Sequence, residues 1–518
     1  MTVSRKKVLW VDDEIEFLRA HILFLETRGY SVFPVFSGDD AVQLIKENGD
    51  DYDIVLLDEQ MPGKDGLTTL EEIKEIAPSL PVVMVTKSEE EEVMEAALGL
   101  KIDGYLTKPV NPSQVLLVCK RLLDCNQLIS KQLKEKYLRS YTEIRSRFSA
   151  ALNVAAFARI FDTLSKWSIE LADVEDEGLR QMHAGLISDC NTLFCDLVSE
   201  QYPRWIKGKG GRSAMATDVL EKIVVPRIGQ GEKTVMVVLS GMRIDQFMDI
   251  EPELRKIFKI DKKLFCSVLP SDLRYSRASL FTGMYPDKIH KLMPDVFEAD
   301  EKVLAEKGKE LLLLGLEKFG IGEDDIFYED VAKGYTLEDI KKVVDISEKT
   351  PLTVIAIDIV KQFMSMRSAG TMLKEIASDE KALRSFTTSW FNTSSVLQLL
   401  KSLSNAGRSV IITSDHGHIL CSRGTEVYGV DNIGQNLRCL FDQKISADER
   451  RVVFLQEPAH YGLPNFSPET RCVIARENYY FIYPEEFENY REQYLNSFQC
   501  GGISMDEMIM PLYICKSR

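Results

Sequence analysis

Residues 53–63, DIVLLDEQMPG, decide the first part of the fold. The run 54–57 is continuously apolar, which is typical of a strand buried on both faces of a parallel sheet, and Asp58 follows it directly. A second such run, VLWVDDE at 8–14, leads into Asp12 and Asp13. Parallel strands place their carboxyl ends at one edge of a sheet, so we expect these three carboxylates to meet there.

The segments around these two runs repeat the same alternation. Short apolar runs alternate with segments of helical period up to about residue 124, which predicts a doubly wound, flavodoxin-like parallel sheet over residues 1–124. Residues 125–214 contain no strand-like run, which predicts a helical bundle. Strand–helix alternation returns over 215–518 and predicts a larger α/β domain. The expected fold class is therefore an α/β multidomain chain with a helical linker.

Four apolar runs of the third region are the expected buried strands. They are TVMVVLS (234–240), LLLLGL (311–316), PLTVIAID (351–358) and RSVIITSD (408–415).

Composition excludes several function classes. The formal net charge of −16 over 518 residues disfavours sequence-independent binding to nucleic acid. No apolar run approaches the roughly 18 residues that span a bilayer, so we expect no membrane association and a cytoplasmic protein. The ten cysteines contain no CxxC pair, which predicts reduced, buried thiols.

The first region resembles the receiver domain of bacterial response regulators. The resemblance implies that Asp58 is the phosphoacceptor, attacking a phosphoryl donor to become an aspartyl phosphate. It implies that Asp13, Asp58 and the backbone carbonyl of Gln60 bind Mg²⁺ directly, while Asp12 acts through bound water. A sensor histidine kinase is the implied phosphodonor.

Three further receiver positions are matched. Thr86 closes the run PVVMVT and can bind a phosphoryl oxygen, and Lys108 in YLTKP supplies a positive partner for the phosphoryl charge. Tyr105 matches the aromatic switch residue of the family. Residues 88–105 then form the face through which phosphorylation would promote a homodimer.

Short stretches along the whole chain extend the resemblance. These are HILFLE, TKSEEEE, KPVNPSQ, RIDQF, SFQCGGIS and EMIMP, and with them the chain resembles the PorX-like response regulators, whose output is a PglZ-type domain of the alkaline phosphatase superfamily. The resemblance implies a two-zinc phosphohydrolase acting on phosphodiesters, with a Thr or Ser nucleophile. It also implies a link to the regulation of type IX secretion.

The distal motifs depart from that pattern at the chemically important positions. The superfamily places metal ligands or the nucleophile at four positions that are occupied here by Ser240, Leu273, Gln362 and Cys500. Of the expected ligands only Asp358, Asp415 and His416 remain. Because two metals need several anionic or imidazole ligands, we expect no zinc and a catalytically inactive output domain.

Three alternatives stay open on the sequence. His418 and Cys500 could rebuild one zinc site with Asp358, Asp415 and His416, and a small shift of register could bring Ser271 into the nucleophile position. Either change would leave a phosphorylation-controlled, zinc-dependent phosphodiesterase. DNA binding through the basic stretch 130–148 is the third and weakest hypothesis, since no recognition helix follows it.

The distal domain also has residues that could bind a ligand without catalysis. An inactive cleft could still bind a nucleotide-like ligand or a protein segment through Arg274, Tyr275 and Arg277.

Overall fold

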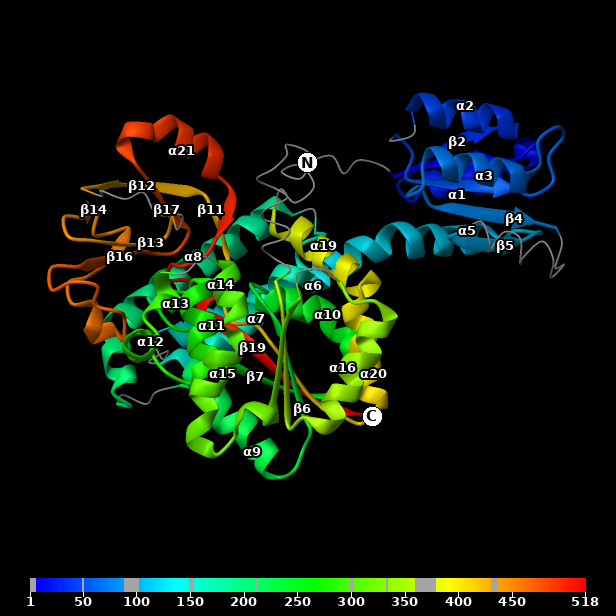
Figure 1. Cartoon of the computed structure of the whole chain (residues 1–518). Helices are drawn as coiled ribbons and strands as arrows, with labels where there is room; N and C mark the ends of the chain where they lie inside the picture. Colours follow the sequence, from blue (N-terminus) through cyan, green and yellow to red (C-terminus); the bar gives the residue numbers. More distant parts are fainter. Residues whose placement is uncertain are drawn as a thin grey trace. The chain divides into compact units, whose positions relative to one another are not determined.

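The structure, a computed structural model, divides into two compact units, Met1–Arg139 and Ser140–Arg518 (Figure 1). The residues that it describes are 6–48, 51–87, 102–148, 153–174, 176–209, 213–298, 301–331, 334–358, 379–429 and 437–518. The division into three domains at residues 124 and 214 stays a prediction.

The first unit contains a five-stranded, wholly parallel sheet in the order β2-β1-β3-β4-β5. The strands are β1 (Lys6–Val11), β2 (Tyr30–Val35), β3 (Ile54–Asp58), β4 (Val82–Thr86) and β5 (Gly104–Thr107). The described helices of the sheet are α1 (Arg19–Glu26), α2 (Gly38–Asn48), α3 (Gly66–Ile76) and α5 (Pro112–Cys119). This architecture confirms the predicted flavodoxin-like receiver fold.

The continuous apolar runs form strands because both faces of the sheet are covered. Along β1, Val8 and Trp10 pack into one hydrophobic cluster, while Leu9 and Val11 pack into the other. Helix α3 begins where the Asp65 carboxylate accepts a hydrogen bond from the Thr68 amide at 2.8 Å, which satisfies a free donor of the first turn.

A helical region follows the receiver, as predicted, and its long described helices are α6 (Cys125–Phe148), α7 (Val154–Glu170) and α8 (Glu177–Ile206). Helix α8 packs directly on the α/β domain of the second unit. The Cys195 thiol donates to the Ile503 carbonyl at 3.0 Å, and the Tyr202 hydroxyl accepts from the Leu269 amide at 2.9 Å. The helical region and the α/β domain therefore share one buried interface.

The second unit is built on a six-stranded sheet in the order β7-β19-β10-β6-β9-β8. Its strands are β6 (Thr234–Leu239), β7 (Phe258–Cys266), β8 (Ile326–Val331), β9 (Leu352–Ile357), β10 (Ser409–Thr413) and β19 (Ile509–Ser517). Strands β10, β6, β9 and β8 run parallel, and β19 and β7 add antiparallel pairs at one side.

Helices cover both faces of this sheet. One face packs against α11 (Leu273–Thr282) and α15 (Gly308–Leu316). The other packs against α10 (Ile244–Ile257), α16 (Leu337–Lys349), α19 (Glu380–Thr393) and α20 (Ser395–Asn405).

One predicted strand is wrong. The run LLLLGL lies in helix α15 rather than in the sheet. Leucine is a strong helix former, and a short apolar run does not distinguish a buried helix from a buried strand. Gly315 lies so close to α11 that an added Cβ would come within 2.7 Å of the Thr282 backbone, which allows the two helices to pack tightly.

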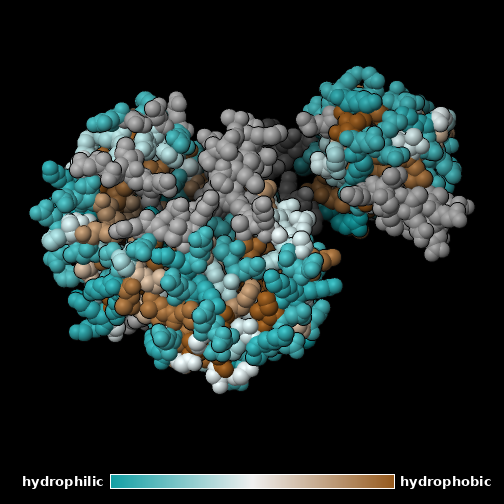
Figure 2. All heavy atoms as spheres, viewed as in Figure 1, coloured by the Kyte–Doolittle hydropathy of each residue, from teal (hydrophilic) through white to brown (hydrophobic). Residues whose placement is uncertain are grey.

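Three small sheets, made of strands between residues 419 and 499, complete the second unit. On the face seen in Figure 2, hydrophilic residues dominate and hydrophobic residues form separate patches. Among the described residues, no helix combines the length and the apolar character needed to cross a bilayer.

Candidate functional site

The carboxyl edge of the receiver sheet brings three carboxylates together. Asp12 follows β1 and is fully buried, Asp58 ends β3 and is 3% exposed, and Asp13 is exposed to solvent. One ligand oxygen from each lies within 4.8 Å of the others. Carboxylate oxygens at an open edge suit a hard cation such as Mg²⁺, so these residues fit the metal that receiver domains generally bind.

Lys108 lies against the same carboxylates. Its Nζ is 2.8 Å from Asp12 and 2.9 Å from Asp58. Burial raises the pKa of Asp58, and the charge of Lys108 opposes that shift. Burial by itself lowers the pKa of Lys108, but the carboxylates of Asp12 and Asp58 outweigh it and raise the lysine pKa. The lysine therefore stays charged beside the predicted phosphoacceptor.

The other receiver positions surround this edge. Thr86, at the end of β4, donates its hydroxyl hydrogen to the Glu59 carboxylate, a contact that the sequence did not suggest. Tyr105 is half-buried against the hydrophobic cluster of one sheet face, and Gln60 is exposed beside Asp13 in a shallow pocket. Residues 88–101 of the expected dimerisation face lie outside the described residues.

In the second unit, the carboxyl edge of the parallel strands also gathers polar side chains. Ser240 follows β6, Asp358 follows β9, and Asp415 and His416 follow β10. Asp330, near the end of β8, joins them from the neighbouring strand. The structure thus brings the three remaining superfamily residues to one edge of the sheet, as their strand ends predicted.

The carboxylate of Asp415 is fully engaged with groups of the protein. Its oxygens accept hydrogen bonds from the Ser240 hydroxyl at 2.9 Å, the His416 amide at 2.9 Å and the Gly241 amide at 3.3 Å. His416 Nδ1 lies at 2.7 Å and Arg277 Nε at 3.0 Å. Four protein residues thus surround this carboxylate, most of them on Oδ1.

Arg277 supplies the positive charge of this edge. Its side chain is 2% exposed, and it bridges Asp415 and Asp330, with Nη1 at 2.9 Å from the Asp330 carboxylate. Burial acts to raise the pKa of Asp415, but His416 and Arg277 outweigh it and hold that pKa well below its usual range. His416 and Arg277 thus both place positive charge against the Asp415 carboxylate.

The position at which the sequence predicted a lost nucleophile is Leu273. Leu273 is the first residue of α11 and is buried, which places an alkyl side chain at the start of this helix. The fully buried Ser271 hydroxyl donates to the Gly502 carbonyl at 2.8 Å and accepts from the Gly501 amide at 3.1 Å. Gln362 lies outside the described residues.

Only part of the alternative zinc site comes together: His416 contacts Asp415 at 2.7 Å and interacts with the Cys500 thiol. In the described chain, the one group of His, Cys, Asp and Glu side chains close enough to hold a metal is Asp12, Asp13 and Asp58. His418 Nδ1 instead lies 2.7 Å from the Gly241 carbonyl oxygen, and burial lowers the pKa of His418 to about 3. The half-buried Cys500 has a pKa raised by burial, a shift that the nearby His416 opposes.

Two expected ligand-binding groups of the cleft are buried as well. Tyr275 is 5% exposed and stacks on Phe297 with 4.8 Å between the ring centroids. Arg277 is committed to its ion pairs, whereas Arg274 remains partly exposed. Of the three side chains proposed to bind a ligand, only Arg274 reaches solvent.

The sequence reasoning missed Asp330 and the role of Arg277. The segment of β8, IFYEDV, did not stand out because its acidic and aromatic residues hide the apolar pattern of a strand. Pairing β8 with β9 would have revealed it, since the register places Asp330 opposite Ala356, two residues before Asp358. An arginine four residues after Leu273, on the same helix face, was the only further signal.

Three family models match the chain in sequence order. Residues 8–120 match the response regulator receiver domain, and residues 127–206 match the PorX response regulator linker domain. Residues 219–514 match the BREX system PglZ alkaline phosphatase-like domain.

The receiver also has individual relatives. It is similar to the transcriptional regulatory protein ResD of Bacillus subtilis (strain 168), with 35% identity over 120 residues, 23% of this chain and 49% of that protein. The match therefore spans about half the length of that relative.

Solved receiver structures match the same part of the chain. A CheY-like receiver domain protein from Methanospirillum hungatei JF-1 is 29% identical, with coverage of 24% of this chain and 98% of that chain and a TM-score of 0.23. The CheX-CheY-BeF3-Mg²⁺ complex from Borrelia burgdorferi gives 27% identity, 22% and 87% coverage and a TM-score of 0.22.

Receiver, linker and alkaline phosphatase-like domain in this order define the class of the protein: a response regulator with a phosphatase-like output domain. More specifically, the chain belongs to the PglZ alkaline phosphatase-like family, whose model matches more than half of it. A receiver domain implies a phosphodonor such as a histidine kinase.

Proposed function

We propose that this protein is a phosphorylation-controlled signalling switch whose PglZ domain acts by binding rather than by catalysis. Its receiver accepts a phosphoryl group on Asp58 from a histidine kinase, and the distal domain transmits the signal without hydrolysing a phosphodiester. One observation carries the second half of this proposal: the buried guanidinium of Arg277 pairs with Asp415 and Asp330 at the edge where the superfamily binds metal.

The receiver residues support the first half. Asp58 would attack the phosphorus of the donor through a carboxylate oxygen, and the leaving group would depart with its electron pair. Asp12, Asp13, Asp58 and the Gln60 carbonyl are the groups that would hold Mg²⁺, which would neutralise charge on the transferring group. Lys108 already lies 2.9 Å from Asp58 and would pair with the added phosphoryl oxygens, and the Thr86 hydroxyl would hydrogen-bond another.

Metal chemistry in the distal domain does not fit its residues. The Asp415 oxygens are surrounded by Ser240, Gly241, His416 and Arg277, and Leu273 stands at the nucleophile position. A second positive charge beside Arg277 would also be repelled. We therefore propose that zinc is not a cofactor of this domain.

The test is a measurement of metal content and turnover. Purified protein is incubated with excess zinc or manganese and bis-p-nitrophenyl phosphate, beside the double variant Asp415→Ala, His416→Ala. We expect substoichiometric metal and no turnover above the variant. Turnover that the double variant abolishes would instead establish a metal-dependent phosphodiesterase, and equal turnover in both would indicate a contaminant.

Two further elements of the proposal rest on the family resemblance. Phosphorylation promotes a homodimer, which light scattering with and without beryllofluoride measures as a doubling of mass. The output domain then binds a protein or nucleotide ligand, and regulation of type IX secretion is the process that the PorX-like resemblance suggests. An unchanged mass with beryllofluoride would contradict the dimer.

A further inference from the structure

A cavity lies within the larger unit, where α7 and α8 meet the α/β domain. Its volume is about 260 Å³, and none of its lining residues belongs to the edge around Asp415. The helical side contributes the hydroxyls of Ser165, Ser168 and Ser188, and the α/β side contributes most of the charged groups. This volume is just below the roughly 300–1,000 Å³ of drug-sized pockets, so the cavity suits a small ligand.

Carboxylates outnumber cationic groups in the cavity wall. Asp245, Glu380, Glu477 and Asp506 line it together with Arg243 and Arg423. An excess of carboxylates disfavours an anionic ligand and favours a cation.

Both guanidiniums are already committed to carboxylates of the wall. Arg243 donates through Nε to Asp245 at 3.0 Å and through Nη1 to Glu380 at 2.6 Å. Arg423 pairs with Glu477 and lies over the Tyr479 ring, 4.1 Å from its centroid. Both arginines therefore make their shortest contacts with carboxylates other than Asp506, to which Arg243 makes only a longer ion pair.

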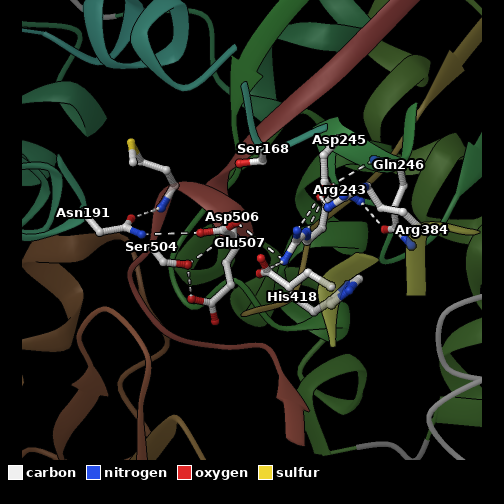
Figure 3. Close-up of polar contacts among 12 residues, drawn as sticks. Ser168, Asn191, Arg243, Asp245, Gln246, Arg384, His418, Ser504, Asp506 and Glu507 are labelled. Atoms are coloured by element: carbon white, nitrogen blue, oxygen red, sulfur yellow. Dashed lines mark hydrogen bonds and ion pairs between the residues drawn. The ribbon is translucent and has the colours of Figure 1, made fainter. Parts of the chain in front are cut away.

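Asp506 is the poorly partnered group. It is 8% exposed, yet its nearest charged partner, Arg243 Nη1, is 3.6 Å away, and its hydrogen bond from Asn191 Nδ2 is 3.4 Å long. Figure 3 shows this carboxylate between Asn191 on one side and Arg243 on the other. A carboxylate accepts up to about four hydrogen bonds, so most of its capacity is unused by these contacts.

We propose that this cavity binds a small organic cation that carries an ammonium or guanidinium group, with Asp506 and Glu380 as its anionic partners. The cation would supply the short, charge-assisted hydrogen bonds that Asp506 lacks. Serine hydroxyls of α7 and α8 would accept its remaining hydrogens. Because the wall comes from both the helical region and the α/β domain, the ligand would link these two parts of the unit.

Proton linkage gives the proposal a signature. Burial, opposed by Arg243 and reinforced by Glu380 and Asp245, raises the pKa of Asp506 to about 7. The charged groups facing it are Arg243 and Asp245 from α10 and Glu380 from α19, with α8 contributing the neutral Asn191. A cation favours the ionised carboxylate, so binding should be about tenfold tighter at pH 8 than at pH 6.

Isothermal titration calorimetry of the full chain tests the proposal, with 1,4-diaminobutane and agmatine as cations and succinate as the anion. We expect both cations to bind, more tightly at pH 8, and succinate not to bind. Asp506→Asn should weaken cation binding by about tenfold or more, since it removes a charge-assisted contact. Glu380→Gln, at a side chain that is 41% exposed, is a second variant with the same expected direction.

The matched control is Asp261→Asn, an exposed carboxylate on β7 that does not line the cavity. It should leave the affinity for both cations unchanged. The proposal is overturned if neither cation binds more tightly than about 1 mM. Equal affinity in wild type, Asp506→Asn and Glu380→Gln overturns it too, as does preferential binding of succinate.

Discussion

Carboxylates gather at the carboxyl ends of the parallel strands in both the receiver sheet and the larger unit's sheet. The two sites differ in the groups that balance this negative charge. At the receiver edge, Asp12 and Asp58 share Lys108, while Asp13 remains exposed to solvent. At the distal edge, Asp415 is fully buried and both of its oxygens are bonded to protein groups, with Arg277 as the cation.

The contrast lies in how each edge balances its carboxylates: the receiver edge leaves Asp13 exposed, whereas the distal edge surrounds Asp415 with protein groups. Lysine is a flexible point charge that can move with an incoming phosphoryl group, whereas the planar guanidinium of Arg277 bridges two carboxylates in a fixed geometry. Similar strand ends therefore carry a lysine-bridged carboxylate pair in one sheet and an arginine-bridged pair in the other.

The largest expected effect is the loss of phosphorylation at the receiver edge. Asp58→Ala should abolish the phosphate adduct that acetyl phosphate and Mg²⁺ form on the wild type, because it removes the attacking oxygen. Intact-mass analysis measures the adduct. Asp39→Asn, an exposed carboxylate that pairs only with Lys64 at 2.8 Å, is the control and should be phosphorylated normally. An equal phosphate adduct on Asp58→Ala would contradict the assignment of Asp58 as the phosphoacceptor.

The next largest effect is a loss of stability when the Arg277 guanidinium is removed from the distal edge. Arg277→Gln removes the guanidinium from the buried Asp415 and the partly exposed Asp330 and leaves His416 as the positive partner of Asp415, so the larger unit should lose about 3 kcal/mol of unfolding free energy. Calorimetric unfolding of the full chain measures this change in the transition of that unit.

Arg274→Gln is the matched control for that change. Arg274 is 32% exposed and pairs with Asp272 only at 3.4 Å, so its loss should cost less than about 1 kcal/mol. Adding manganese should raise the unfolding temperature of the larger unit more in Arg277→Gln than in the wild type, because the variant removes the guanidinium that lies between Asp415 and Asp330. Equal losses for both arginine variants would contradict the guanidinium's role.

A smaller effect concerns pH and the cavity of the larger unit. The pKa of Asp506 is raised by burial to about 7, above its unfolded value, so its contribution to stability is present at low pH and lost as pH rises through 7. Between pH 6 and 8 the wild type should lose about 1 kcal/mol from this group, and Asp506→Asn should lose less. Denaturant unfolding at the two pH values measures the difference, and identical pH dependence would refute the assignment.

The smallest effect separates the two units. Asp65→Ala removes the N-cap of α3 and should lower the stability of the receiver by about 1 kcal/mol while the transition of the larger unit stays unchanged. Differential scanning calorimetry distinguishes the two transitions. A shift of both by the same amount would mean that the units unfold together.

Much of the receiver could be read from the sequence because its functional residues follow directly from strand ends. Asp12, Asp58, Thr86 and Lys108 each stand at or just after a continuous apolar run, and the sheet confirms that they share one edge. Strand periodicity and the parallel order are local consequences of the sequence, so the site followed from them.

The distal edge could be predicted only in part. The sequence placed Ser240, Asp358 and Asp415 at strand ends, but LLLLGL became a helix and β8 with Asp330 passed unnoticed. These errors have one cause: a short segment becomes helix or strand according to the partners against which it packs, and those partners lie far away in the chain.

By itself the sequence determined the receiver fold and its acidic cluster, and it predicted lost metal ligands at Ser240 and Cys500 and a lost nucleophile at Leu273. Only the tertiary structure decided the partners of Arg277, because Asp330 lies in β8 and Asp415 lies just after β10, 53 and 138 positions away along the chain. The tertiary structure also decided that Asp506 of α22 (Met505–Met508) lies beside Asn191 of α8 in the wall of a cavity. These two residues are 315 positions apart in the chain. Hydrogen bonds and ion pairs depend on distances in space, and no local pattern encodes such distances across a sheet.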